Sequence, residues 1–268
     1  MKEKMTQRPV LYYFILTFAI SWLGAYLTVS GKLIHGLNLI KPDGLRMYPV
    51  LLLGPPLSGV AMTALLYGTA GLKRLFSGLC LGRVARKWYF FFLAIPPIMI
   101  NVVLFALNQL FSGQFVVNNF IVGFLFGIPA GLLEEIGWTG YLFPQLRKKA
   151  GLFPSALLLG LIWGAWHYPV IYFLGSASPH GPMLLPFFGV FILVMAAIRI
   201  FICYIYEKTR SLLLAQLFHI SSTGSLVVFG PLNLSPEAET TWYLLYADAL
   251  WLLIAFFLIN AFIRHEVA

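Results

Sequence analysis

The chain has 268 residues, of which 60% are hydrophobic and only 10% are charged. This balance excludes an ordinary soluble globular domain, because such a domain needs far more polar surface. The composition instead predicts a protein that crosses a lipid bilayer several times.

Apolar stretches long enough to cross a membrane recur along the whole chain. A hydrocarbon core of about 30 Å requires roughly 20 mostly apolar residues in an α-helix. About eight such stretches are present, and the connections between them are too short to hold a soluble domain. We therefore expect an all-α, polytopic transmembrane helical bundle that forms a single domain over residues 1–268. The expected spans are 10–30, 47–68, 89–111, 119–144, 153–175, 183–206, 211–230 and 242–263.

The formal net charge of +9 is explained by membrane topology. If eight spans alternate in direction, fourteen of the eighteen Lys and Arg residues lie on one side, three lie on the other, and Arg199 lies inside a span. The positive-inside rule then places both termini in the cytoplasm. Because topology explains the positive charge, we expect no nucleic-acid partner. The fourteen residues are Lys2, Lys4, Arg8, Lys73, Arg74, Arg83, Arg86, Lys87, Arg147, Lys148, Lys149, Lys208, Arg210 and Arg264.

The first apolar run follows a basic start, which is also how a secretory signal begins. This run is longer than the apolar part of a signal peptide, and no small-residue cleavage site follows it. We therefore expect it to be retained as the first span.

Glycines recur every four residues on two of the expected spans. Gly123, Gly127 and Gly131 lie on the fourth span, and Gly160 and Gly164 lie on the fifth. Small residues at this spacing form a helix face that lets another backbone approach closely. We therefore expect the fourth and fifth spans to be tight neighbours.

Six ionisable side chains fall inside the expected spans, where a charged group costs about 2.5 to 3.5 kcal/mol on insertion scales. Each of them must face the interior of the bundle, form a pair or lose its charge. A chain is expected to keep six such groups only if they have a use. The six are Glu134, Glu135, His167, Arg199, His219 and Asp248.

The paired glutamates give the clearest functional indication. Glu134 and Glu135 differ by about 100° around a helix, so one can face a central cavity while the other supports it from the side. Two carboxylates buried side by side cannot both ionise easily, and a carboxylate held in this way suits a general base. Arg199 either snorkels to the cytoplasmic side or serves as their counter-ion. Asp248, near the outer end of the last expected span, is expected to be structural.

Each intramembrane histidine shares a helix face with a second group one turn away. Trp163 precedes His167 by four residues, and Thr223 follows His219 by four residues. Taken alone, a histidine in a membrane helix is more often a hydrogen-bonding residue between helices than a catalytic residue. The two histidines therefore indicate a catalytic site only in combination with the glutamates.

Three short motifs in these spans carry a family resemblance. In this chain they read EEIGWT at residues 134–139, WGAWH at 163–167 and HISST at 219–223. At these residues the sequence resembles the CPBP family of intramembrane proteases, which includes CAAX prenyl endopeptidases and the bacteriocin-processing or self-immunity proteins called Abi. The corresponding family motifs are EExxxR, FxxxH and HxxxN, on separate helices. The resemblance covers a motif-bearing core at about residues 119–230.

The resemblance implies an intramembrane endopeptidase that hydrolyses a peptide bond with a glutamate-activated water. Glu134 and His167 would hold and activate the water, and Glu135 would orient the site. His219 and Thr223 would donate hydrogen bonds to the oxyanion that develops on the scissile carbonyl. No covalent enzyme intermediate is needed in this mechanism.

The resemblance also implies partners and a location. We expect Trp138 and Trp163 to contact the substrate, which would be a membrane-associated peptide or protein. We expect no cofactor. The expected location is the plasma membrane, as a multi-pass protein whose other partner is the bilayer itself. The sequence leaves open whether the substrate is prenylated.

Three positions depart from the family pattern. Thr139 stands in place of the arginine, Trp163 in place of the phenylalanine and Thr223 in place of the asparagine. Trp keeps an aromatic wall, and Thr can still donate through its hydroxyl, although with a shorter reach than Asn. Loss of the arginine removes a cation that could hold Glu135 ionised. We hypothesise that Arg199 compensates for this loss.

A zinc metalloprotease is one alternative, because two Glu and two His can bind zinc. No HExxH pair is present, and the ligands would have to come from three helices. Cys80 and Cys203 have no spacing typical of a metal or redox site.

Two further alternatives are not enzymes. A proton-coupled transporter would also line a cavity with acids and histidines, but it should show broken helices in matching halves. Here the functional groups are gathered in the fourth to seventh spans. The altered Arg and Asn positions also fit a non-catalytic membrane scaffold or bacteriocin-immunity protein of the same fold.

Overall fold

A computed structural model of the chain describes residues 2–79 and 84–263. Within these ranges every regular element is a helix, so the all-α fold is confirmed. Cys80, Arg83 and Arg264, which contributed to the expectations about cysteine chemistry and topology, lie outside the described residues.

The helices follow one another with short connections. The first group is α1 (Lys2–Gln7), α2 (Pro9–Phe18), η1 (Ala19–Leu23), α3 (Gly24–Ile34), α4 (Lys41–Leu51), α5 (Gly54–Ser77) and α6 (Arg86–Leu110). The central group is η2 (Ile121–Gly123), α7 (Phe124–Gly137), η3 (Trp138–Leu142), α8 (Phe143–Arg147), α9 (Leu152–Trp166) and α10 (Tyr168–Ile171). The last group is η4 (Gly181–Met183), α11 (Leu184–Thr209), α12 (Leu212–Phe229) and α13 (Pro236–Ile263).

Seven helical segments of the described chain are long and apolar enough to cross a membrane, which confirms a multi-pass helical bundle. They match seven of the eight expected spans. The seven are Pro9–Ile34, Lys41–Ser77, Arg86–Leu110, Ile121–Arg147, Gly181–Thr209, Leu212–Phe229 and Pro236–Asn260.

The expected fifth span, 153–175, is shorter than the sequence suggests. Its main helix, α9, has 15 residues, which at 1.5 Å per residue is a rise of about 23 Å. The chain then turns at His167 into the four residues of α10. Both termini lie on the same side of the membrane only if α9 and α10 together count as an eighth crossing. The cytoplasmic placement of both termini therefore stays a prediction.

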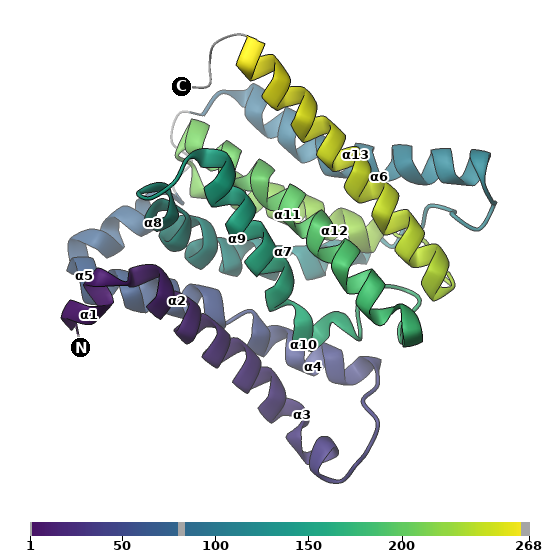
Figure 1. Ribbon diagram of the computed structural model, residues 1–268, viewed down its shortest axis with the longest axis horizontal. Coiled ribbons are helices and arrows are strands. Elements are labelled where there is room, and N and C mark those ends of the chain that lie inside the picture. The colour runs from purple at the N-terminus through teal and green to yellow at the C-terminus, as the bar shows by residue number, and fades with distance from the viewer. Residues whose placement is uncertain (1, 80–83, 264–268) are drawn as a thin grey trace.

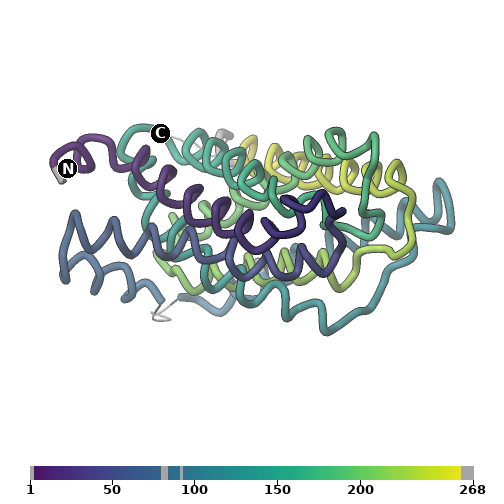
Figure 2. Tube along the Cα trace, turned by 90° about the horizontal axis from the view of Figure 1, so that it is seen from below, coloured from purple at the N-terminus to yellow at the C-terminus, as the bar shows by residue number. Residues whose placement is uncertain are grey.

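The motif-bearing helices lie in the middle of the bundle. Figure 1 shows α7, α9, α11 and α12 at the centre, with α1–α5 along one side and α6 and α13 along the other. Figure 2, turned by 90°, shows that the helices form a body that is flatter than it is long. Large apolar side chains such as Phe105, Ile121 and Leu252 are exposed on outer surfaces, as expected of surfaces that face lipid.

The glycine faces pack closely, but against helices other than those expected. On α7, a Cβ at Gly127 would lie only 2.8 Å from the backbone nitrogen of Gly224 on α12. On α9, a Cβ at Gly160 would lie 2.6 Å from Cα of Ala196 on α11. The expectation that these glycine faces make the fourth and fifth spans tight neighbours is therefore wrong, although side chains of the two spans do meet, as in the bond between Trp163 and Glu134. The spacing of glycines shows which face of a helix lacks side chains, but it does not show which helix packs against that face.

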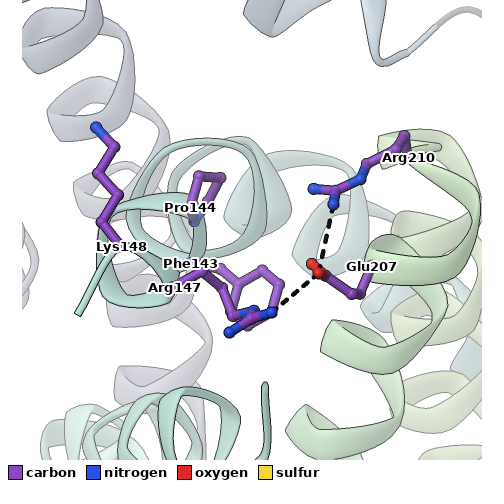
Figure 3. Close-up of a pocket in the computed structure, with 6 residues that line it drawn as sticks. All are labelled: Phe143, Pro144, Arg147, Lys148, Glu207 and Arg210. Atoms are coloured by element: carbon purple, nitrogen blue, oxygen red, sulfur yellow. Dashed lines mark hydrogen bonds and ion pairs between the residues drawn. The ribbon is translucent and has the colours of Figure 1, made fainter. Parts of the chain in front are cut away.

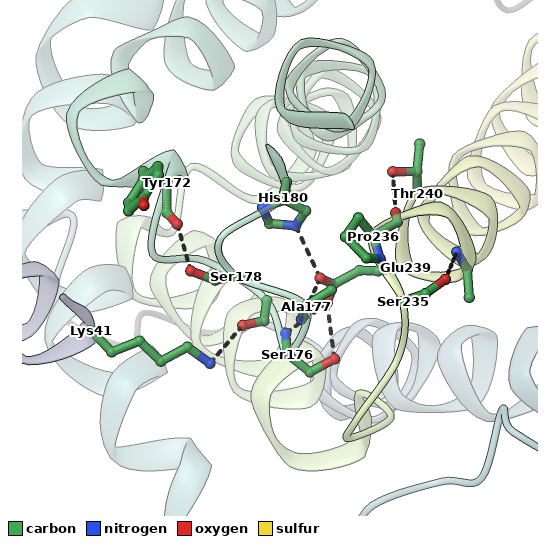
Figure 4. Close-up of polar contacts among 12 residues, drawn as sticks. Lys41, Tyr172, Ser176, Ala177, Ser178, His180, Ser235, Pro236, Glu239 and Thr240 are labelled. Carbon is green, nitrogen blue, oxygen red and sulfur yellow. Dashed lines mark hydrogen bonds and ion pairs between the residues drawn. The ribbon is translucent and has the colours of Figure 1, made fainter. Parts of the chain in front are cut away.

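A buried carboxylate holds the connection after α10 against the start of α13 (Figure 4). Glu239 accepts hydrogen bonds from the backbone nitrogens of Ser176 at 2.8 Å and Ala177 at 2.9 Å. Nε2 of His180 lies 3.0 Å from Oε2 of Glu239, the oxygen that also accepts from Ala177. The His180 ring stacks on Phe187 with 3.9 Å between ring centroids.

Two further features fit this arrangement of the loop. The backbone φ of Gly175 is 78°, and the carboxylate of Glu239 occupies the space that a Cβ at Gly175 would need. Only glycine meets both conditions without strain. Glu239 also lies in the first turn of α13, where the helix dipole favours a negative charge.

We expect Glu239→Ala to lower the free energy of unfolding by about 3 kcal/mol, because it leaves a buried histidine and two backbone donors unpaired. Thermal unfolding of the purified protein in detergent measures this effect. Glu237→Ala is the matched control, because Glu237 lies in the same first turn but is exposed. Equal effects of the two substitutions would contradict the assignment of Glu239 as the holding residue.

Candidate active site

Side chains from four helices meet at the centre of the bundle. Glu134 and Glu135 lie near the end of α7, immediately before the π-helix η3. Trp163 and His167 end α9, Arg199 lies in α11, and His219 and Thr223 lie in α12. A π-helical turn widens the helix locally and is often found at functional sites. The three motif-bearing spans and α11 therefore bring polar groups together, and the residues that hydrogen bonds join are Glu134, Glu135, Trp163, His167, Arg199 and His219.

Glu135 is the most heavily bonded member of the cluster. Its side chain is fully buried, and its Oε2 accepts from Nη1 of Arg199 at 2.7 Å. The hydroxyl of Thr139 donates to the same oxygen. The other oxygen, Oε1, lies 2.6 Å from Nδ1 of His219. Glu135 thus joins α7 to both α11 and α12 by charged hydrogen bonds.

The guanidinium of Arg199, which comes from α11, lies beside Thr139, the position in η3 where the family motif has its arginine. It is fully buried, so it does not snorkel to the membrane surface. Its guanidinium carbon lies 4.0 Å from the centre of the Trp163 ring, and Nη1 also lies 3.3 Å from the Thr139 hydroxyl. Its Nε and Nη2 have no hydrogen-bond partner within the described chain. The ion pair that the compensation hypothesis requires is therefore present.

Glu134 and His167 are both held by Trp163. The indole Nε1 donates to Oε2 of Glu134 at 2.7 Å, and the backbone carbonyl of Trp163 lies 2.8 Å from Nδ1 of His167. Oε1 of Glu134 makes no hydrogen bond with the residues that the structure describes. One residue therefore positions both groups that the resemblance assigns to the attacking water.

The hydrogen bond of His167 fixes which ring nitrogen is available. A carbonyl oxygen can only accept, so the bond to Trp163 requires a proton on Nδ1. In the neutral ring Nε2 is then the nitrogen that can accept a hydrogen bond. The ring is surrounded edge-on by Trp166 and Phe191, with centroids 4.9 Å and 5.2 Å away. His167 is thus oriented by one polar contact and enclosed by aromatic rings.

His219 and Thr223 occupy one face of α12, as their spacing predicts. Because Nδ1 of His219 faces the Glu135 carboxylate, its Nε2 is the nitrogen left for another partner. The edge of this ring also contacts Trp163, with 5.0 Å between centroids. Thr223 is half-buried and makes no side-chain hydrogen bond in the described ranges. Its hydroxyl remains free to donate.

Sequence reasoning missed two residues of this region. Trp166 and Phe191 enclose His167, but nothing in their spacing separated them from the many other aromatic residues. Trp138, an expected substrate contact, is fully buried and packs edge-on against Trp166 and Tyr13. The substrate-contact role of Trp138 stays a prediction.

Asp248 lies apart from the cluster, but not where it was expected. Helix α13 begins at Pro236, so Asp248 is twelve residues inside the helix and not near its outer end. Its side chain is exposed and makes no ion pair or hydrogen bond with described residues. The expected depth was wrong because the polar residues Glu237 and Glu239, which seemed to belong to a loop, form the first helical turn.

The residues that the structure describes contain no group of three or more His, Cys, Asp and Glu side chains placed to hold a metal ion. The two glutamates and two histidines are instead bonded to Trp163, Arg199 and each other. The catalytic roles given to these residues stay predictions, as does the absence of a cofactor.

Comparisons with known proteins match the central helices. Residues 125–224 match the family model described as Type II CAAX prenyl endopeptidase Rce1-like. The curated protein named CAAX prenyl protease 2 from Methanococcus maripaludis is 34% identical over 112 residues. This alignment covers 41% of this chain and 41% of the archaeal protein, so the chain spans less than half the length of that relative.

The matched segment contains all three motifs and every residue of the central cluster, Arg199 included. Asp248, which lies outside the cluster, also lies outside the matched segment. The family match and the archaeal relative both show that this motif-bearing segment is similar to CAAX prenyl endopeptidases.

Proposed function

We propose that the protein is an intramembrane endopeptidase that hydrolyses a peptide bond with a water activated by Glu134. The observation that carries this proposal is a pair of hydrogen bonds at Trp163, whose indole donates to Glu134 and whose carbonyl accepts from His167. These bonds leave Oε1 of Glu134 and Nε2 of His167 uncommitted. A water bound by both atoms would be oriented for attack.

The reaction proceeds in two steps. The water oxygen forms a bond to the scissile carbonyl carbon while Glu134 takes a proton from the water, and the negative charge moves to the carbonyl oxygen. The tetrahedral intermediate then collapses, the carbon–nitrogen bond breaks, and Glu134 returns its proton to the leaving amine. His167 accepts a hydrogen bond from the water through Nε2 and keeps it in place.

The oxyanion is stabilised from α12. Thr223 donates through its hydroxyl. His219 donates through Nε2 while its ring carries both protons, because Nδ1 already donates to Glu135. Such donors act on charge that exists only in the transition state, so they raise the rate more than they raise substrate affinity. Glu135 acts through His219 as a positioning residue, and Arg199 supplies its counter-ion.

The proposed substrate is a membrane-associated peptide or protein. The name of the archaeal relative, CAAX prenyl protease 2, makes a prenylated C-terminal CAAX peptide the first probe to use. The proposed location is the plasma membrane. A probe with the same peptide but without the prenyl group shows whether the lipid is required.

A non-catalytic membrane scaffold or immunity protein is the second candidate. Thr139 and Thr223 favour it, because they replace the motif arginine and asparagine. Under this alternative the wild-type protein cleaves neither the prenylated nor the unprenylated probe, and the central cluster serves only to hold the helices together.

We expect Glu134→Gln to reduce cleavage of the prenylated probe at least 10²-fold, because Gln can accept from Trp163 but cannot take a proton. Proteoliposomes containing a fluorescence-quenched peptide measure the rate. Asp248→Asn is the matched control, because it also neutralises an acid in a membrane span but lies outside the cluster. Similar losses in both variants would contradict the assigned role of Glu134.

The same assay separates the glutamate mechanism from the zinc alternative. Cleavage by wild-type protein after treatment with a strong chelator should be unchanged if Glu134 activates the water without a metal. Loss of cleavage that added zinc restores would favour the metalloprotease.

We expect Thr223→Val to lower kcat about 10²-fold with little change in KM, because Val has the same shape but cannot donate to the oxyanion. Thr223→Asn, which restores the family residue, should keep the activity. Thr241→Val on α13 makes the same chemical change at an exposed site. An unchanged kcat in Thr223→Val would exclude Thr223 from the oxyanion site.

We expect Arg199→Leu to abolish cleavage and to destabilise the protein by about 3 to 5 kcal/mol, because Glu135 would be buried without a counter-ion. The double variant Arg199→Leu with Thr139→Arg returns an arginine to the family position and should recover part of both losses. Thermal unfolding and probe cleavage measure the two effects. The compensation hypothesis fails if Arg199→Leu alone behaves like the wild type.

A further inference from the structure

A basic pocket lies away from the central cluster, between α8 and the end of α11 (Figure 3). Its volume is about 260 Å³. Three of its lining residues are cations and one is an acid, so its lining carries a surplus of positive charge. The lining residues are Phe143, Pro144, Arg147, Lys148, Glu207 and Arg210.

One carboxylate in the pocket is shared by two guanidinium groups. Oε1 of Glu207 lies 3.1 Å from Nη2 of Arg147 and 3.3 Å from Nη2 of Arg210. Lys148 points away from this pair in Figure 3, and its Nζ bonds to Gln145 at 2.8 Å. A single acid cannot neutralise both arginines. The pocket is therefore suited to bind an additional anion.

The backbone at Arg210 is held in an unfavourable conformation. It follows the last residue of α11 with φ 55° and ψ 14°, a left-handed conformation that usually belongs to glycine. For a residue with a side chain this conformation costs roughly 1 to 2 kcal/mol of conformational energy. The arginine side chain that occupies this position is 68% exposed and reaches over Glu207. A strained position that presents a charged group to a pocket indicates a binding role.

The two arginines lie at the ends of candidate membrane spans, so we place the pocket at the level of the lipid headgroups. The membrane-spanning segment Ile121–Arg147 ends at one of its arginines, and the segment Gly181–Thr209 ends immediately before the other. The positive-inside rule, applied to the charges along the chain, predicts that these helix ends are on the cytoplasmic side. The inner leaflet carries anionic lipids, and basic pockets between membrane helices on this side bind anionic headgroups.

We propose that this pocket binds the phosphate group of an anionic lipid from the cytoplasmic leaflet. The volume of about 260 Å³ holds a phosphate and part of its glycerol, while the acyl chains stay in the bilayer. Arg210 is the main proposed ligand, because an exposed planar guanidinium can bind phosphate oxygens through two parallel hydrogen bonds. Arg147 adds positive charge, since its Nη1 already donates to the carbonyl of Ala150 and its Nη2 to Glu207.

Binding would also connect the pocket to the central cluster. Arg147 ends the continuous run of helices α7, η3 and α8, which carries Glu135, and Arg210 ends α11, which carries Arg199. A phosphate held between the two arginines would tie together the cytoplasmic ends of the two helices that the buried ion pair joins. An anionic lipid should therefore stabilise the folded protein whether or not the protein is a protease.

The experiment measures thermal unfolding of the full-length protein in neutral micelles supplemented with phosphatidylglycerol or with phosphatidylcholine. Wild-type protein should be stabilised by phosphatidylglycerol in a saturable manner and not by phosphatidylcholine. Arg210→Gln and Arg147→Gln should each weaken the apparent affinity about fivefold, from about 1 kcal/mol for each basic residue. Lys208→Gln is the matched control, because it removes the same charge from α11 but does not line the pocket.

The possible results separate the sources of the anion. Equal weakening in Arg210→Gln and Lys208→Gln would show general attraction to the basic surface and would overturn the pocket. Equal stabilisation of wild-type protein by the two lipids would overturn it as well. A third arm adds inorganic phosphate to micelles that contain no anionic lipid. Saturable stabilisation in that arm, lost in Arg210→Gln, would replace the lipid with free phosphate as the ligand.

Discussion

Glu135 can remain buried at the centre of a membrane protein because Arg199 and His219 reach it from two other helices. A carboxylate without a partner in this environment would cost several kcal/mol, and so would the guanidinium. The ion pair at 2.7 Å and the histidine contact at 2.6 Å therefore determine how α7, α11 and α12 can be arranged. The glycine faces of α7 and α9 permit the close approach that these contacts need.

Trp163 connects this ion pair to the second glutamate. Its ring lies under the Arg199 guanidinium, its Nε1 donates to Glu134, and its carbonyl accepts from His167. The family motif has phenylalanine at this position, which could supply a ring face but no N–H donor. The substitution therefore adds a hydrogen bond that phenylalanine cannot make, in the same cluster where Thr139 has lost the motif arginine.

The sequence predicted the parts of this structure that depend on local pattern. Hydropathy located seven of the eight expected spans, and the spacing of motifs placed the glutamates and His219 on faces that meet. Arg199 was one of two open possibilities, a counter-ion or a snorkelling residue, and the structure shows it paired with Glu135. Other contacts depend on which helices become neighbours, and periodicity along one helix does not contain that information. For this reason the helices that pack on the glycines and the bond between His180 and Glu239 could not be predicted from the sequence alone.

The shortness of α9 has a consequence for the lipid around it. Its rise of about 23 Å is less than the hydrocarbon thickness of about 30 Å. The exposed Tyr168 and Tyr172 follow directly, and tyrosines of this kind settle at the boundary between headgroups and acyl chains. The bilayer beside α9 should accordingly be thinner than elsewhere, since lipids adapt to a short helix by local thinning. His167, at the end of that helix, would then lie a short distance from bulk water, although the chain around it is surrounded by lipid.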